Sequence, residues 1–495
     1  MSALDALLPS GGAQNVVEFV ASGTLSNGQA VILNSNGSVT AVAGGTTNLP
    51  QAIPKGSLAV LSASTTYNIR CAFDPTTKGR LLIIYKDSSA SNYLTAVIGT
   101  VSGASISFAA VTQLSNTFGF GSVSFDPNTS GKFIVGYQKG GNPYGIILRV
   151  GTVSGTNSIS FGAEVTATTF ETSAFSISYD PNTADKFILA ASSGSVGTAL
   201  ICSVTGNSIY LNSTFNFNGH TTSPVVRFNP ATANQVILSY TDNANSQYGT
   251  ARICTVSGTS LSYATEYVFS SQPSGSNPEG TVMDASKTGI FVVAWGTAGK
   301  SIIGTISGTA ISYGSVANFI SAYTQSIQVA FDPVTTNRFV VSYEDSQNSN
   351  YGTIRVGTVS GSTISYAAKS TYVNSPITQV NGISFDPNAS GMFATAFGQA
   401  NNSFHGKAVI SQLAATVAST NLTATNLIGI SAEAIASGAT GKVNVLGGLN
   451  EGQSSLTPAS IYYVQSNGTI TTASASPAQK IGQAISSTKL NLVDL

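Results

Sequence analysis

The side chains that could carry out catalysis are few in this sequence, and the acidic ones are the most numerous. Hydrolysis of a glycosidic bond needs two carboxylates that face each other across that bond. Most aspartates lie instead in a recurring Asp-Pro corner, such as Asp126 and Asp332, or in the polar loops at Asp87, Asp242 and Asp345. Acids outside this pattern include Glu164, Glu171, Glu266 and Glu279. None of these four stands beside an Arg cluster or a Tyr-Glu pair, and the sialidase-type Ser-x-Asp-x-Gly-x-Thr-Trp repeat is absent.

Histidines and loop residues add no further catalytic or metal-binding set. His220 and His405 lie in different repeats with no acidic neighbour at triad-like spacing, so we interpret both as solvated. The sequence contains no GxSxG, HExxH or phosphate-binding glycine loop. The loop Asp242–Asn245 could bind calcium, but the equivalent Asp345–Asn348 lacks a second carboxylate. We therefore predict no catalytic residue, no metal and no cofactor, and we expect that the chain is not an enzyme.

Composition argues against nucleic acid and membranes as partners. Only 8% of the 495 residues are charged, and 20 Lys and Arg balance 20 Asp and Glu, so the surface has no long-range field to attract either partner. No apolar run reaches the roughly 18 residues that span a membrane. No Lys or Arg precedes Lys55, so no secretory signal is expected.

The cysteines are interpreted as structural. Cys71, Cys202 and Cys254 are too few for a disulfide framework, and no CxxC pair is present. Cys202 and Cys254 fall where other repeats carry glycine, which predicts small buried residues inside a third strand.

A repeat positions nearly all of these residues. The stretch from Ser326 to Ala368 shows its pattern: blocks of alternating apolar and polar side chains, closed by Asp-Pro, Asn/Ser-rich or Ser-Gly turns. This pattern is typical of four short antiparallel strands. The corner recurs with a mean spacing of 52 residues at Asp74, Asp126, Asp180, Asn229, Asp284, Asp332 and Asp386. A turn of the Thr-Val-Ser-Gly type follows in every unit but the seventh. Seven units of four strands predict an all-β fold, a seven-bladed β-propeller.

Three features of the repeat are expected to be structural. The corner Asp should accept hydrogen bonds from backbone N–H groups two or three residues on. The second strand ends in a large side chain, which includes the single tryptophan and which we interpret as packing between blades rather than as a sugar-stacking platform. These residues are Tyr85, Tyr137, Tyr240, Trp295, Tyr343 and Phe397, with Ala191 as the exception. The fourth strand of the seventh unit is poorly marked, so residues 58–62 are predicted to complete it and to join the first blade to the last.

The two ends of the chain carry a different pattern. Leu25–Thr40 aligns without gaps to Leu456–Thr471, and each copy is followed by an Ile-Gly strand, at 428–435 and 481–488. Asn36-Gly37 is a strong hairpin signal. The simplest account is one small β module of two related halves, with the propeller inserted into the first half. The expected parts are an N-terminal arm at 1–14, the module at 15–43 and 427–495, and the propeller at 44–426.

The terminal module resembles a segment of virion structural proteins of tailed phages, notably marine and cyanobacterial ones. The resemblance rests on residues 20–42, VASGTLSNGQAVILNSNGSVTAV, and on residues 428–490. Within the second stretch it rests on a YYV…GTI hairpin and the closing strand GQAISSTKL. Such segments occur in tail-fibre-like and capsid-decoration-like chains, and the resemblance implies no catalytic residues.

This resemblance implies a non-enzymatic virion protein assembled in the host bacterial cytoplasm. The module would anchor the chain to other virion proteins, and the propeller would project outward, either as a tail appendage that contacts a host-surface glycan or protein or as a capsid decoration. A symmetric homo-oligomer, such as a trimer, is expected because weak anchors gain from multivalency. The alternatives are a soluble lectin, a glycan-processing propeller or a protein-interaction scaffold. The arm is interpreted either as a disordered tail or as a peptide that orders against a neighbouring subunit.

Overall fold

The computed structural model describes most of the chain. The described residues are 16–44, 52–54, 56–139, 145–155, 157–170, 172, 174–271, 278–284, 289–296, 298–400, 403–413, 421–423, 425–445, 447–465, 467–474 and 479–492. Their regular structure is β-strand, apart from one short 3-10 helix at Ser346–Asn348. The predicted all-β class is therefore confirmed, while the N-terminal arm at 1–14 lies outside the described residues.

The chain divides into two compact units. Residues 1–48 and 415–495 form one, here called the split unit, and residues 49–414 form the other, here called the repeat unit. The predicted propeller at 44–426 includes residues 421 and 422, but two contacts place these residues in the split unit. The Asn421 side-chain amide donates to the Ala41 carbonyl at 2.7 Å, and the buried Leu422 packs in the same apolar cluster as Val42.

The repeat unit consists of antiparallel sheets that follow the predicted repeats. The strands of the first two repeats are β5 (Ala59–Phe73), β6 (Arg80–Asp87), β7 (Tyr93–Ser102), β8 (Ser105–Phe108), β9 (Thr112–Phe125), β10 (Lys132–Lys139), β11 (Ile146–Ser154), β12 (Ser158–Phe161) and β13 (Val165–Thr166). The next two repeats contain β14 (Ala174–Tyr179), β15 (Lys186–Ser192), β16 (Gly197–Thr205), β17 (Ser208–Asn218), β18 (Thr221–Phe228), β19 (Gln235–Asp242), β20 (Tyr248–Ser257) and β21 (Ser260–Ser270).

The remaining repeats follow the same order. Their strands are β22 (Pro278–Met283), β23 (Ile290–Trp295), β24 (Lys300–Ser307), β25 (Ala310–Tyr313), β26 (Ala317–Asn318), β27 (Gln328–Phe331), β28 (Arg338–Asp345), β29 (Tyr351–Ser360), β30 (Thr363–Tyr366), β31 (Ser370–Phe385), β32 (Met392–Gln399) and β33 (His405–Leu413). In several repeats the outer strand is split in two. The first part of β9, for example, pairs with β7, and its last part pairs with β10 as the first strand of the next sheet.

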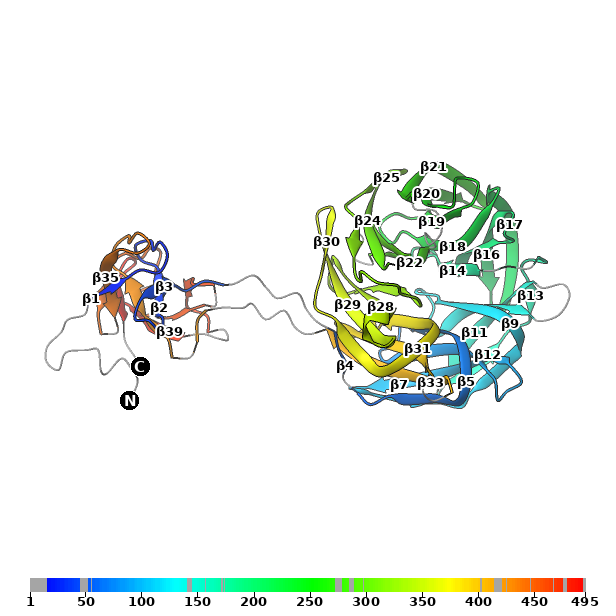
Figure 1. The fold of residues 1–495 in the computed structure, drawn as a ribbon, viewed down its shortest axis with the longest axis horizontal. Coiled ribbons are helices and arrows are strands. Elements are labelled where there is room, and N and C mark those ends of the chain that lie inside the picture. Colours follow the sequence, from blue (N-terminus) through cyan, green and yellow to red (C-terminus); the bar gives the residue numbers. More distant parts are fainter. Residues whose placement is uncertain are drawn as a thin grey trace. The chain divides into compact units, whose positions relative to one another are not determined.

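The sheets of the repeat unit follow one another around a common centre (Figure 1). Their first strands contact each other in the order β5, β9, β14, β18, β22, β27 and β31, and β31 in turn contacts β5. The predicted pairing of residues 58–62 with the last repeat is confirmed: three of these residues pair with β33, as Ala59↔Ala408, Val60↔Lys407 and Ser62↔Gly406. A short strand that the sequence analysis did not predict, β4 (Ala52–Pro54), pairs with the far end of β33.

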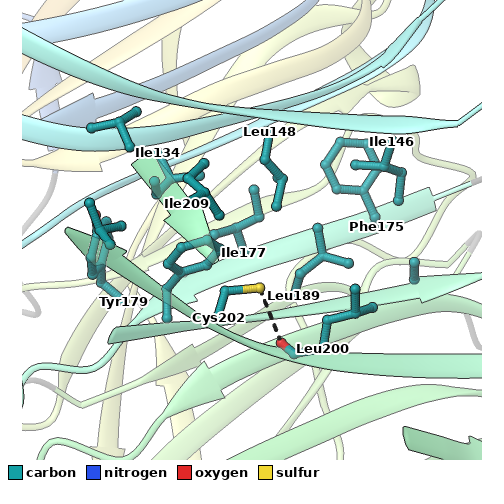
Figure 2. Packing of buried hydrophobic residues seen from close by; sticks show 14 residues of the cluster. Ile134, Ile146, Leu148, Phe175, Ile177, Tyr179, Leu189, Leu200, Cys202 and Ile209 are labelled. Atoms are coloured by element: carbon teal, nitrogen blue, oxygen red, sulfur yellow. Dashed lines mark hydrogen bonds between the residues drawn. The ribbon is translucent and has the colours of Figure 1, made fainter. Parts of the chain in front are cut away.

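Apolar side chains on both faces of each sheet hold neighbouring repeats together. Figure 2 shows one such interface, where Ile134 and Leu148 of one sheet pack against Ile177, Leu189 and other buried residues of the next. A strand that is covered on both faces reads as a continuous apolar run rather than an alternating one. This explains segments such as FILAA at residues 187–191, all of which are buried.

The split unit contains two sheets with the same strand order. The first sheet runs β1 (Val16–Val20), β35 (Thr440–Val445), β34 (Leu427–Ser431), β2 (Ala30–Leu33) and β3 (Val39–Ala41). The second runs β36 (Leu449–Asn450), β40 (Leu490–Leu492), β39 (Gln479–Ala484), β37 (Ile461–Val464) and β38 (Ile470–Thr471). The aligned segments of the sequence thus occupy equivalent strands.

A pair of glycines supports the same equivalence. A Cβ added at Gly429 would lie 1.9 Å from the Asn444 carbonyl oxygen, and one added at Gly482 would lie 2.0 Å from that of Asn491. Both positions therefore require glycine, because the backbone of the neighbouring strand approaches too closely for any side chain. The two related halves predicted from the sequence have the same local construction.

Candidate functional site

The corner aspartates are buried and hold the turns of the repeats. In each case one side-chain oxygen accepts the backbone N–H two residues on, at 2.8–3.0 Å, for Asp74, Asp126, Asp180, Asn229, Asp332 and Asp386. These side chains are at most 1% exposed. The predicted structural role of the corner is confirmed.

The second oxygen of three corner aspartates joins neighbouring repeats, a role that the sequence analysis missed. It accepts the backbone N–H of Asp185 for Asp126 (3.2 Å), of Asn337 for Asp284 (3.4 Å) and of Gly79 for Asp386 (2.8 Å). Each donor comes five residues after the corner of its own repeat and has a positive φ, between 60° and 71°. Gly, Asn and Asp adopt this conformation most readily, so their recurrence at this offset was a usable signal.

The loop acids are also occupied by local bonds. Asp87 accepts hydrogen bonds from the hydroxyls of Ser62, Ser64 and Ser89. Burial alone would raise the pKa of Asp87, but the bonds from Ser64, Ser89 and Ser62 outweigh burial and lower it. Asp345 caps the 3-10 helix by accepting the Gln347 N–H, and it also pairs with Lys369 at 3.0 Å.

Two glutamates have tyrosine and cationic neighbours, contrary to expectation. The Tyr137 hydroxyl donates to Glu164 at 2.8 Å, and Lys139 pairs with the same carboxylate at 2.6 Å. The Tyr240 hydroxyl donates to Glu266 at 2.6 Å, and Arg252 pairs with it at 2.9 Å.

These tyrosine and cationic neighbours could not be predicted, because the outer part of each repeat folds back beside residues far from it in sequence.

Burial would raise the pKa of Glu164, but its bonds to Lys139 and Tyr137 lower it. Glu164 and Glu266 lie in different repeats, so they do not form a pair of facing carboxylates. Glu171 and the side chain of Glu279 lie outside what the structure describes.

The remaining candidate residues are apart from one another. His220 is exposed and His405 is half-buried, in different repeats. Cys202 on β16 and Cys254 on β20 are buried as predicted, and burial raises the pKa of each thiol to about 12, so both stay unreactive thiols at neutral pH. In the described part of the chain no group of three or more His, Cys, Asp or Glu is placed to hold a metal ion.

The aromatic series packs between sheets, as expected. Trp295 is 2% exposed, and its ring contacts that of Phe269, from the preceding sheet, at 5.3 Å and 66°. Equivalent contacts join Phe217 to Tyr240 and Phe319 to Tyr343. Because Trp295 is covered, no sugar can stack on it.

A central cavity is the strongest candidate for a binding site. It has a volume of about 1190 Å³, and its wall is formed largely by the first strands of the repeats, from β5 through β31. Ligand sites are concave and combine apolar walls with a few polar groups. This cavity combines the Phe and Pro residues of the corners with serines, Asn68 and Gln328.

Serines in the cavity wall connect first strands that do not pair as a sheet. The Ser122 and Ser124 oxygens accept the N–H groups of Ile177 and Tyr179 at 3.3 and 3.2 Å. The same link recurs from Ser176 and Ser178 to β18, and from Ser384 to Phe73. Unpaired backbone N–H groups would be costly at this position, so the serines serve the fold as well as the cavity surface.

Two arginines in the cavity wall carry the only formal charges among its described lining residues. Arg70 lies on β5 and Arg227 on β18, two first strands that are separated by β9 and β14. Burial lowers the pKa of each to about 10, and repulsion from Arg227 contributes at Arg70. Both remain protonated at neutral pH. Neither arginine was predicted as a site residue, although both lie an even number of residues before a corner and therefore on the same face of their strands.

Comparison with solved structures supports a β-propeller. The WD40 domain of coronin from Toxoplasma gondii is 10% identical to this chain, with 78% of this chain and 90% of that domain covered and a TM-score of 0.50. Sqt1 from Chaetomium thermophilum is 11% identical, with 70% and 83% covered and a TM-score of 0.46. The fold assignment rests on the first of these, and at such identity the likeness concerns the fold alone.

No protein-family model matches the chain, and no curated protein sequence matches it. None of the helices in the described residues is long and apolar enough to cross a membrane.

Proposed function

We propose that this chain is a non-enzymatic structural protein of a tailed phage particle. The split unit anchors it to other virion proteins, and the repeat unit, a seven-bladed β-propeller with four-stranded blades, is displayed outward. The displayed propeller serves either as a tail fibre or appendage that adheres to the host surface, or as a capsid decoration. The assembled form is a homo-oligomer, and a trimer fits a fibre.

The observation that carries this proposal is the construction of the split unit. Both ends of the chain, which carry the resemblance to phage virion segments, come together in one compact unit with two sheets of the same strand order. The repeat unit is joined at both its ends, along the chain, to the segments of the split unit, so attachment through the split unit requires no surface of the inserted domain.

The side chains support a binding role over catalysis. The described corner and loop carboxylates accept backbone or hydroxyl hydrogen bonds, and Glu164 and Glu266 are paired with cations in separate repeats. A low-charge surface also suits a particle that meets variable salt, since uncharged contacts are not screened.

Immunogold labelling of intact particles tests the proposal. Antibodies raised against the full chain would be applied to phage particles from a lysate in which the gene is expressed. Label at the tail tip or fibres supports adhesion, and label over the head supports decoration. Absence of label from every particle, with the protein free in the lysate, would overturn the virion role.

The alternative function is a soluble glycan-binding lectin or glycan-processing propeller. Glycan-array binding combined with hydrolysis assays on the full chain separates the two forms of this alternative. Turnover that is lost in Glu164→Gln or Glu266→Gln would favour the enzyme, because these are the carboxylates with tyrosine and cationic neighbours.

A further inference from the structure

The described lining residues of the central cavity carry a net positive charge. Arg70 and Arg227 are part of its wall, and no Asp or Glu is found among its described lining residues. Placing two like charges in one partly buried space costs free energy. A chain with only 20 Lys and Arg in 495 residues places two of them here, which points to a ligand of opposite charge.

Each guanidinium group makes one hydrogen bond within the part of the chain that the structure describes. Nη1 of Arg70 donates to the Ile69 carbonyl at 3.1 Å, and Nη1 of Arg227 donates to the Val226 carbonyl at 2.7 Å. A guanidinium has five N–H donors, and within the described chain neither group has an ion-pair partner. By contrast, Arg80 and Arg338 each pair with the corner aspartate of their own repeat.

Serine hydroxyls add further donors to the same space. The oxygens of Ser122, Ser124 and Ser176 each accept a backbone N–H from the next first strand. No acceptor for their own hydrogens is found in the described part of the chain. A hydroxyl whose oxygen is engaged in this way still donates its hydrogen, so these serines offer donors to a ligand that the arginines attract.

We propose that the central cavity binds an organic anion of about the size of a sugar, whose single carboxylate, sulfate or phosphate group lies between Arg70 and Arg227. Planar guanidinium groups match the paired oxygens of such groups. A bare inorganic anion would engage only the arginines, whereas the serines and Gln328 of the same wall provide partners for the hydroxyls of an attached body. This site does not depend on the phage role proposed above.

Isothermal titration calorimetry on the full chain tests the site. The probes are galacturonate, galactose 6-sulfate and galactose 6-phosphate, with galactose as the neutral control and inorganic sulfate and phosphate as the controls for size. At least one acidic sugar is expected to bind about tenfold or more tighter than galactose, because a charge-assisted hydrogen bond contributes at least that factor. It is also expected to bind tighter than either inorganic anion, because only the sugar adds hydroxyl contacts to the serines and Gln328.

Three variants assign the binding to the arginines. Arg70→Gln and Arg227→Gln are each expected to weaken the acidic sugar about tenfold or more, while the thermal stability of the ligand-free protein stays equal or rises, because the repulsion is relieved. Arg149→Gln is the matched control: Arg149 stacks on Phe161 at 5.2 Å outside the cavity, so binding is expected to be unchanged.

Three results would overturn the proposal. The first is that no acidic sugar binds tighter than galactose. The second is that inorganic sulfate or phosphate binds as tightly as the acidic sugars, since the cavity would then recognise no organic body. The third is that Arg70→Gln and Arg227→Gln bind as the unaltered protein does. The first two comparisons need only the unaltered chain, so they hold even where a variant fails to fold.

Discussion

The corner carboxylate of Asp386 should be one of the most sensitive positions in the repeat unit. Its Oδ1 accepts the Asn388 N–H at 2.8 Å, and its Oδ2 accepts the Gly79 N–H at 2.8 Å, which joins the last repeat to the first. The side chain is 0% exposed. Asp386→Ala removes both acceptors and leaves the buried Gly79 N–H without a partner.

The magnitude follows from these two bonds. A hydrogen bond to a charged group contributes about 1.5–3 kcal/mol, and a buried donor left without a partner costs about 1–3 kcal/mol. Because these contributions overlap, we expect Asp386→Ala to lower the free energy of unfolding by roughly 3–5 kcal/mol. Asp386→Asn keeps one acceptor but turns an amide donor toward the Gly79 N–H, so an intermediate loss is expected.

Urea unfolding followed by tryptophan fluorescence reports on the unfolding of the repeat unit, because the single tryptophan, Trp295, lies there. The control is Asn388→Ala, which removes only the solvent-exposed bond from the Asn388 amide to the Pro75 carbonyl at 3.2 Å and should cost less than about 1 kcal/mol. If Asp386→Ala costs no more than this control, the corner does not join the repeats and the reasoning is refuted.

Three further predictions concern other positions. The pKa of Asp87 lies below its ordinary 3.8 in the folded chain, so its stabilisation is complete at neutral pH and is lost as the pH falls through that lowered value; the difference in Tm between the unaltered chain and Asp87→Asn should shrink in acid, and a constant difference would contradict this. Gly151→Ala should lower the urea midpoint, because the added Cβ would lie 2.1 Å from the Phe133 ring, whereas Gly219→Ala, with nothing within 4 Å, should be neutral; equal effects would argue against this packing. Lys407→Pro should destabilise the repeat unit by about 3 kcal/mol or more, because it interrupts β33 where β5 pairs with it. An unchanged pattern of limited proteolysis would contradict the importance of this pairing between the first and last repeats.

The repeat could be predicted because its signals are local. The Asp-Pro corner and the Ser-Gly turn act within a few residues of themselves, so their spacing alone indicates the strands between them. The relation between the chain ends was likewise visible as an ungapped alignment, and it places β2 and β3 in the positions of β37 and β38.

Contacts between repeats could not be predicted in the same way. The Asp386–Gly79 bond joins opposite ends of the unit, and its only trace in the sequence is the recurrence of Gly, Asn or Asp five residues after the corner. The Tyr137–Glu164 bond lies within one repeat, but it too depends on how the outer strand folds back. The convergence of Arg70 and Arg227 depends on the curvature of the whole unit. The sequence shows only that both arginines lie an even number of residues before a corner. This places them on the same face of their strands but does not show that they line one cavity.

Quantitative mass spectrometry of gradient-purified phage particles tests the proposed function most directly. A virion protein should sediment with infectious particles in a fixed ratio to the major capsid protein. It should also stay with them through a high-salt wash, because a chain with only 8% charged residues is expected to make largely uncharged contacts. Recovery of the chain only in the soluble fraction, or in a ratio that varies between preparations, would contradict the account.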